Sequence, residues 1–284
     1  MKISSPIAVT GATGVQGGAL ATLLLDRGQA VRALTRDPAS SAARALRDRG
    51  AEVVRADFDD PVSLDAALSG CRALFLMSTP FGTDAANEIR QGVAAIDAAV
   101  RADVQHVVFS SVAHADRGTG VPHFDSKYEI EQYLARAGLA WTVLGPAKFM
   151  DNYATGWAAS LLSEGRLVLP LSADRSIALV CAADIAGMAA LAMAEPERFA
   201  GVRVDIAGDQ RTPVEQAESF AAVLGRPVAF ERVEARGYGD DLAAMFDYFD
   251  TVGLDVDTAA LRAEYPEVGW RTFDQWLGAT LVRT

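Results

Sequence analysis

Residues 7–27 read IAVTGATGVQGGALATLLLDR, and this stretch decides the fold that we expect for the chain. A short apolar run ends at Thr10, and glycines follow at positions 11, 14 and 17 before an apolar stretch with helical spacing. The order of strand, glycine turn and helix opens a βα unit. Short apolar runs keep alternating with longer alanine-rich stretches to about residue 146. This pattern predicts a parallel sheet covered by helices.

The three glycines suit a turn that holds a dinucleotide. Gly11 permits the tight turn, Gly14 lets the backbone approach a diphosphate, and Gly17 allows close packing of helix on strand. Amide groups at the positive end of the helix would bind the phosphates. The GxxGxxG spacing alone is weak evidence, because glycines also punctuate ordinary βα units, but its place after the first strand strengthens it. The predicted contacts of this turn are Thr10, Gly11, Thr13, Gly14, Val15 and Gln16.

The predicted fold class is α/β: a Rossmann-type doubly wound parallel sheet with a smaller C-terminal α+β lobe. Residues 1–147 would form the dinucleotide-binding domain and residues 148–284 mainly a substrate lobe. Segments near 176–206 would return to the Rossmann sheet. The aromatic residues of the stretch 237–277 would border the substrate cleft or pack in the core: Tyr238, Phe246, Tyr248, Phe249 and Trp270. The strands expected in the first half are Ile7–Thr10, Ala30–Thr35, Glu52–Ala56, Ala73–Met77, His106–Ser110 and Trp141–Leu144.

The end of the second predicted strand indicates which dinucleotide binds. It reads ALTRDP, so Arg36 stands where an NAD site usually offers a carboxylate to the ribose. A guanidinium binds a 2′-phosphate in a bidentate fashion, so we expect NADP(H) in preference to NAD(H). Asp37 leaves the alternative open, because an acidic neighbour could point to the same pocket, and Arg36 could also be a solvated surface residue.

The third and fourth predicted strands end in ADFDD and MSTP. Their carboxyl ends lie at the edge where ligands collect in open α/β sheets. Asp59 and Asp60, just before Pro61, suit a helix N-cap better than a ligand. The residues expected to border the adenine and the nicotinamide half of the cofactor are Asp57, Phe58, Ser78, Thr79 and Pro80.

Composition excludes several classes of partner. The chain has 37 acidic and 26 basic residues, and its net charge of −11 repels nucleic-acid backbones and anionic membranes. Cys71 and Cys181 are far apart, lie in apolar segments and belong to no CxxC or Cys/His cluster. We therefore expect free buried thiols, no metal site and a reduced, cytoplasmic setting.

Five motifs carry a family resemblance: GATGVQGG at 11–18, ALTRDP at 33–38, HVVFSSVA at 106–113, HFDSKYEIEQYLARAG at 123–138 and GPAKFMDN at 145–152. Together they make the chain resemble the NmrA-like group of atypical short-chain dehydrogenase/reductases over essentially its whole length. The resemblance implies a Rossmann fold and NAD(P) binding. It also implies membership of a group that contains both reductases and redox sensors.

The resemblance also bears on catalysis. Ordinary short-chain dehydrogenases use a tyrosine four residues before a lysine as proton donor, and the lysine holds the nicotinamide ribose. Lys127 matches that lysine, but His123 stands four residues earlier, and the adjacent Tyr128 points about 100° away around the helix. Two alternatives follow for His123: it donates the proton, or it caps or packs the helix and no turnover occurs. Ser110 and Ser111 match the place of a substrate-binding serine in related enzymes, or either one bonds a loop backbone.

The motif GPAKFMDN places Pro146, Lys148, Phe149 and Asn152 where the family lines the nicotinamide pocket. Lys148 occupies a position where we expect an aromatic residue in the redox-sensor branch of the family. A cation beside the nicotinamide would favour an anionic or carbonyl acceptor. The alternative is a surface ion pair with Asp151.

Two main functions are compatible with these residues, and a structural subunit of a larger reductase assembly is a third alternative. The first is an oxidoreductase in which Lys127 and His123 are catalytic and a hydride passes from NADPH to a small electron-poor acceptor: a quinone, imine, carbonyl or conjugated alkene. The second is a non-catalytic NADP(H)-binding redox sensor that acts through a protein partner. The absence of the proton-donating tyrosine favours this sensor. Either protein could be a homodimer.

Overall fold

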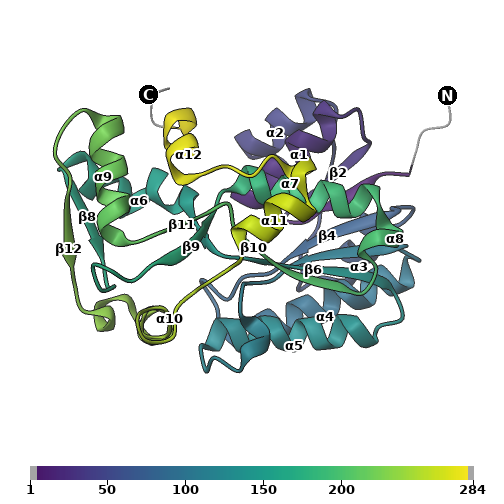
Figure 1. The fold of residues 1–284 in the computed structure, drawn as a ribbon. Helices are drawn as coiled ribbons and strands as arrows, with labels where there is room; N and C mark the ends of the chain where they lie inside the picture. The colour runs from purple at the N-terminus through teal and green to yellow at the C-terminus, as the bar shows by residue number, and fades with distance from the viewer. Residues whose placement is uncertain (1–4, 281–284) are drawn as a thin grey trace.

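The computed structural model describes residues 5–280, without the side chain of Trp157. Its largest element is a seven-stranded sheet in which every pairing is parallel (Figure 1). The strand order is β10-β6-β5-β4-β1-β2-β3. The strands are β1 Ile7–Val9, β2 Val31–Thr35, β3 Glu52–Arg55, β4 Ala73–Met77, β5 His106–Ser110, β6 Ala140–Pro146 and β10 Val202–Ile206.

The direction of winding reverses between β1 and β4, which are neighbours in the sheet. From β1 the chain proceeds to β2 and β3 on one side, and from β4 to β5 and β6 on the other. A crevice forms outside the carboxyl ends of the strands at such a reversal, because the following helices leave in opposite directions. The predicted doubly wound Rossmann sheet is confirmed, with β1 at its switch point.

Helices cover both faces of this sheet (Figure 1). Strand residues alternate between the two layers: Ile7 and Val9 pack with one hydrophobic cluster and Ala8 with the other. Side chains of Ser40, Asp60 and Asp84 cap the helices that follow β2, β3 and β4. One layer contains α1 Val15–Asp26, α2 Ser41–Asp48 and α7 Ala182–Ala194, and the other contains α3 Pro61–Leu68, α4 Ala85–Arg101 and α5 Pro122–Arg136.

A smaller lobe, at the left of Figure 1, contains a three-stranded sheet and a parallel strand pair. The sheet has the order β11-β9-β7, with β9 parallel to β7 and antiparallel to β11. Its strands are β7 Lys148–Phe149, β9 Ile177–Val180 and β11 Asp209–Arg211, and the pair is β8 Arg166–Leu169 and β12 Ala229–Arg232. The α-helices of the remaining chain are α6 Gly156–Ser163, α8 Pro196–Phe199, α9 Pro213–Leu224, α10 Asp240–Thr251, α11 Thr258–Glu264 and α12 Phe273–Thr280. Single 3-10 turns span Ala115–Arg117, Met150–Ala154, Ala235–Tyr238 and Pro266–Val268.

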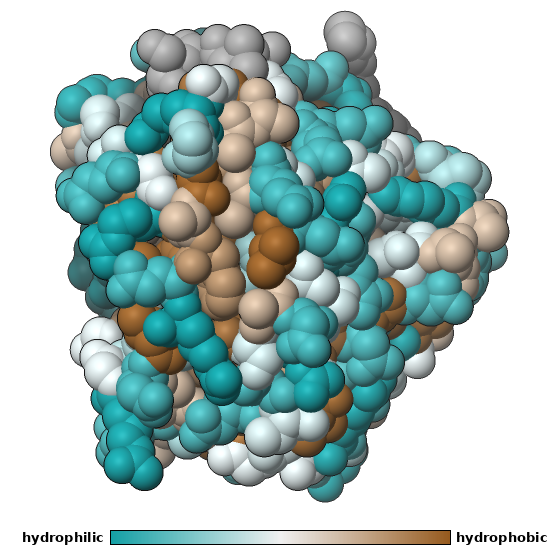
Figure 2. Space-filling model, turned by 60° about the vertical axis from the view of Figure 1, so that its left-hand side comes forward, coloured by the Kyte–Doolittle hydropathy of each residue, from teal (hydrophilic) through white to brown (hydrophobic). Residues whose placement is uncertain are grey.

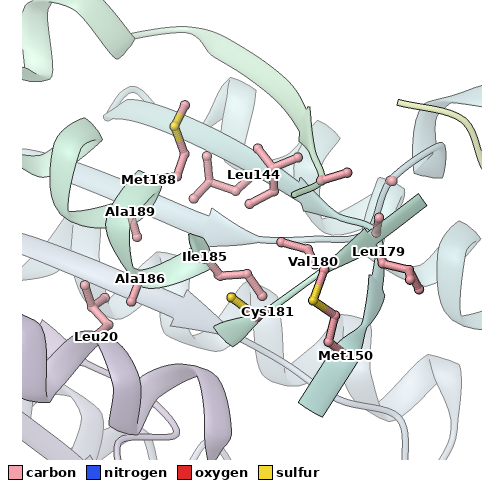
Figure 3. Close-up of a cluster of buried hydrophobic side chains, with 14 of the residues drawn as sticks. Leu20, Leu144, Met150, Leu179, Val180, Cys181, Ile185, Ala186, Met188 and Ala189 are labelled. Atoms are coloured by element: carbon pink, nitrogen blue, oxygen red, sulfur yellow. The ribbon is translucent and has the colours of Figure 1, made fainter. Parts of the chain in front are cut away.

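One hydrophobic cluster joins the large sheet to the lobe (Figure 3). It runs from Leu20 of α1 through Ile185 of α7 to Val180 of β9 and Met150. In the segment near 176–206, β10 pairs with β6 at the edge of the large sheet, whereas β9 belongs to the lobe. The division of the chain at residue 147 stays a prediction, because the core is continuous across it.

Within residues 5–280, no helix combines the length and the apolar character needed to cross a bilayer. Cys71 and Cys181 are both buried free thiols, as expected.

Candidate functional site

The glycine turn follows β1 and is held tightly against β4. Gly11 has φ +58°, and a Cβ added there would also collide with the Met77 side chain. A Cβ at Gly17 would lie 2.5 Å from the Thr10 carbonyl oxygen, so only glycine lets α1 pack this closely. The Thr10 hydroxyl donates to Phe75 O at 3.1 Å and accepts from Met77 N at 2.8 Å. These contacts give Thr10, Gly11 and Gly17 structural roles in shaping the turn.

The start of α1 lies open beyond this turn. Gly14 is the N-cap residue and offers no side-chain cap, and Thr13, Gly14 and Val15 are exposed. The first amide groups of a helix lack partners within the helix, and they carry its positive end. The arrangement can therefore hold a diphosphate without displacing any protein contact.

Arg36 lies exposed just after the end of β2. Its guanidinium makes no hydrogen bond or ion pair with any residue of the range 5–280. The neighbouring Asp37 carboxylate accepts a hydrogen bond from Ala39 N at 2.9 Å and so closes its own turn. The guanidinium is thus available to a ligand phosphate, whereas the competing carboxylate is engaged.

Asp57 and Phe58 follow β3 and are half-buried. The Asp57 carboxylate accepts from Asp59 N at 3.1 Å. Asp60 caps α3, as predicted, by accepting from Ser63 N at 3.2 Å. Asp59 does not share that role: it pairs with Arg90 of α4 at 2.6 Å, because α4 packs against α3, which begins just after Asp59.

A cavity of about 610 Å³ lies between the carboxyl edge of the large sheet and the lobe. It brings together most of the predicted residues of the nicotinamide half and leaves the glycine turn, Arg36, Asp57 and Phe58 outside, further along the sheet edge. The predicted residues that line it are Gln16, Ser78, Thr79, Pro80, Ser110, His123, Lys127, Pro146, Lys148 and Phe149.

Lys127 extends from α5 across the ends of β4 and β5. Its Nζ donates to Glu88 Oε1 at 2.7 Å and to Ser78 O at 3.0 Å. Glu88 is fully buried, and its carboxylate also accepts from the hydroxyls of Ser78 at 2.9 Å and Ser126 at 2.5 Å. Sequence reasoning missed Glu88. The signal was a carboxylate at residue 88 on the apolar face of α4 that also carries Gly92, Ala95, Ile96 and Ala99.

His123 lies one turn before Lys127 and is held by a residue of the lobe. Asp241 accepts from His123 N at 3.0 Å and lies 2.9 Å from His123 Nδ1. Burial lowers the pKa of the imidazole, although the Asp241 carboxylate opposes that shift. Sequence reasoning also missed Asp241, which begins α10 far along the chain.

Lys148, on β7, is half-buried and faces Tyr153. Its Nζ donates to the Tyr153 hydroxyl at 2.5 Å and lies 3.9 Å from the centre of that ring. Burial lowers the pKa of Lys148 to about 7 and raises that of Tyr153. Asp151 instead accepts from Ala182 N at 2.8 Å, so the surface ion pair considered for Lys148 does not form.

Ser110 ends β5 and donates to Gln16 Oε1 at 2.7 Å, so the fifth strand is tied to the start of α1. The next residue, Ser111, donates to Glu131, a buried carboxylate whose other oxygen accepts from Arg203 at 2.9 Å. Both serines line the cavity, but Ser110 bonds the predicted cofactor turn, whereas the Ser111 hydroxyl is engaged by Glu131.

The lobe contributes an apolar wall to the cavity. Among the predicted aromatic residues of 237–277, Tyr238, Phe246 and Phe249 line it, whereas Trp270 packs in the core. The surface on this side of the molecule shows apolar side chains in a band among hydrophilic ones (Figure 2). Further lining comes from Leu161, Leu162, Leu167, Val168, Leu169, Leu242, Met245 and Leu254. The cavity therefore pairs a polar corner at the sheet edge with a large apolar surface.

A family model described as NmrA-like matches residues 4–277. The chain belongs to the NmrA-like family. A reductase of Streptomyces griseus, named (4-alkanoyl-5-oxo-2,5-dihydrofuran-3-yl)methyl phosphate reductase, is 32% identical over 92% of this chain and 82% of its own. The NADPH-dependent quinone oxidoreductase of Escherichia coli, solved with NADPH, is 26% identical, with a TM-score of 0.80 over 97% of this chain and 99% of its own.

The negative transcriptional regulator NmrA, solved with NADP, has a TM-score of 0.84 at 21% identity over 99% of this chain and 97% of its own. At that identity the likeness extends to the fold alone. The proteins similar to this chain thus include ones named as reductases, and the fold is shared with one named as a regulator.

Proposed function

We propose that this NmrA-like protein is an NADPH-dependent oxidoreductase that reduces a small electron-poor acceptor. The observation that carries the proposal is the cavity itself: its polar corner adjoins the glycine turn through Gln16 and Ser110, and its opposite wall is apolar. Enzyme sites for small molecules have this composition, a mainly apolar surface with a few convergent polar groups. Bound NADPH would supply the hydride.

The chain's own residues fit the cofactor. The uncapped start of α1 suits the diphosphate, and the unpaired Arg36 guanidinium suits a 2′-phosphate. Lys127 would hold the nicotinamide ribose from the corner of the cavity, where Glu88 and Ser78 O orient its ammonium. The remaining proposed contacts are Thr10, Gly11, Thr13, Gly14, Val15, Gln16, Asp57, Phe58, Ser78, Thr79, Pro80, Ser110, Pro146, Lys148 and Phe149.

The acceptor would lie against Phe246, Phe249 and the leucines of α6 and β8. Such a wall favours an uncharged conjugated or aromatic molecule, since it gains by leaving water. The relatives named above suggest a quinone or a conjugated carbonyl compound, and an imine or conjugated alkene fits the same chemistry.

A redox sensor is the second candidate, and the engagement of His123 by Asp241 favours it. A histidine held in this way can serve purely to fasten α10 to α5. The protein would then bind NADP(H) without turnover and present its surface to a protein partner.

Titration of the protein with NADPH and NADH, followed by nicotinamide fluorescence, tests the cofactor. We expect saturable binding of both and tighter binding of NADPH. Steady oxidation of NADPH with a panel of quinones and conjugated enones would support the enzyme. Saturable binding with no oxidation by any acceptor would favour the sensor, and no saturable signal with either nucleotide would refute both.

A further inference from the structure

Lys148 is a cation without a counter-ion beside an apolar cavity. Within residues 5–280 no carboxylate lies at ion-pair distance from its Nζ, and its one hydrogen bond goes to the Tyr153 hydroxyl. Two other enclosed cations that face carboxylates are ion-paired, Lys127 with Glu88 and Arg203 with Glu131. An unpaired charge in such surroundings is costly, and titratable groups in such surroundings gather at functional sites.

Tyr153 holds Lys148 in a fixed orientation. Its hydroxyl proton goes to Gln216 Oε1 at 2.5 Å, so the phenol oxygen accepts from Lys148 and cannot also donate to it. Gln216 is fully buried, and the Tyr153 ring packs at right angles against Phe220. One N–H bond of the ammonium is thereby anchored, and two remain for a ligand in the cavity.

The other polar groups in the cavity are less suited to give up a proton. Lys127 already donates two hydrogen bonds, to Glu88 and Ser78 O. Burial lowers the pKa of His123 and so favours its neutral form, and the tautomer that donates Nδ1–H to Asp241 leaves a lone pair on Nε2. Lys148 therefore has the free N–H groups that a protonation step requires.

We propose that Lys148 is the proton donor to the carbonyl oxygen of the acceptor. The proposal rests on the oxidoreductase function proposed above and specifies its acceptor as a carbonyl compound, either a quinone or a conjugated enone. The acceptor is reduced when a hydride, which carries an electron pair, adds either to the carbonyl carbon or to a carbon conjugated with it. The carbonyl π bond breaks, and its electrons move onto the oxygen. The oxygen that gains this negative charge takes a proton from Lys148 Nζ. The neutral amine that remains regains a proton from solvent.

The acidity of Lys148 supports this role. Burial lowers its pKa to about 7, so the ammonium can release a proton and regain one near neutral pH. Tyr153 faces it directly, and the other titratable groups lining the cavity are His123, Lys127, Arg166 and Tyr238. A pH profile alone would mix these groups, so the test uses variants and chemical rescue.

The test compares Lys148→Ala and Lys148→Arg with the wild type, using the neutral quinone or enone that the wild type reduces fastest. Lys148→Arg keeps the charge but cannot act as an acid near neutral pH. We expect both variants to lose about 10²-fold or more in kcat. Ethylammonium chloride should restore part of the rate of Lys148→Ala, and tetramethylammonium chloride at equal ionic strength, which has charge but no proton, should not. The loss should be smaller with a cationic triphenylmethane dye, whose carbon accepts a hydride without a proton.

A readout independent of turnover is the ionisation of the amine. Acetic anhydride labelling at a series of pH values, read by mass spectrometry, should give a midpoint for Lys148 near 7, far below the ordinary value of about 10.4. Full activity in Lys148→Ala, equal rescue by both ammonium salts, or an amine titrating near 10 would overturn the proposal alone. A wild type that binds NADPH but reduces no acceptor would instead overturn the proposed function, and this step with it.

Discussion

Removing the charge of Lys127 should destabilise the fold as well as the cofactor site, because its partner is buried. The Glu88 side chain is 0% exposed and that of Lys127 is 11% exposed, with Nζ and Oε1 2.7 Å apart. In Lys127→Met the Glu88 carboxylate would keep only the hydroxyls of Ser78 and Ser126. Breaking a buried pair in this way costs about 3–5 kcal/mol. For a chain of this size that corresponds to a fall in Tm of roughly 5–8 °C.

The double variant Lys127→Met/Glu88→Gln removes both charges and should recover at least about 2 kcal/mol relative to Lys127→Met. Urea unfolding of the wild type, both single variants and the double variant, followed by tryptophan fluorescence and circular dichroism, gives the coupling energy. The double variant also separates the effect on NADPH binding from the effect on stability, since it should fold but bind NADPH only weakly. Arg101→Met, which breaks an exposed ion pair with Asp65, is the matched control and should change stability by less than about 1 kcal/mol.

The reasoning would be refuted if Lys127→Met unfolded within about 0.5 kcal/mol of the wild type, as a surface substitution does. It would equally be refuted if the double variant were no more stable than Lys127→Met.

Three further predictions concern other residues. Arg36→Ala should weaken NADPH binding by roughly 10–150-fold, since charge-assisted hydrogen bonds contribute about 1.5–3 kcal/mol, and should leave NADH binding unchanged in fluorescence titrations. Gly17→Ala should lower the unfolding free energy by about 1–3 kcal/mol or more and abolish NADPH binding, whereas Gly278→Ala, whose Cβ would meet open space, should be neutral or stabilising in the same urea melts. Burial lowers the pKa of His106 in the folded chain. As pH falls below about 6.5, the unfolded chain takes up a proton at this histidine before the folded chain does, so the unfolding free energy decreases. His106→Asn should reduce this decrease by up to about 1 kcal/mol in urea melts between pH 5.5 and 7.5.

Each of these has a contrary result. Equal weakening of NADPH and NADH by Arg36→Ala would remove the 2′-phosphate role. Unimpaired NADPH binding by Gly17→Ala would contradict the close approach of α1 to Thr10 O. An unchanged pH dependence in His106→Asn would show that this histidine titrates alike in the folded and unfolded chain.

The sequence by itself was sufficient to predict the fold class, the glycine turn and the first six strands. The predicted ends of these strands lie within two residues of the observed ones. Those features are local: a strand is read from a short apolar run, and Gly11 and Gly17 from their distance to its end. Arg36 and Lys127 are predicted cofactor contacts for the same reason, since each stands at a set offset from a strand or from a motif.

Only the tertiary structure decided which groups face these residues. Asp241 meets His123 across 118 residues, Gln216 meets Tyr153 across 63, and Glu88 meets Lys127 across 39. No periodicity links such pairs, because packing of the lobe against the sheet brings them together. The environment of Lys148, and with it the chemistry proposed for the cavity, comes from that packing: removal from water and the lack of a counter-ion are properties of the enclosing volume.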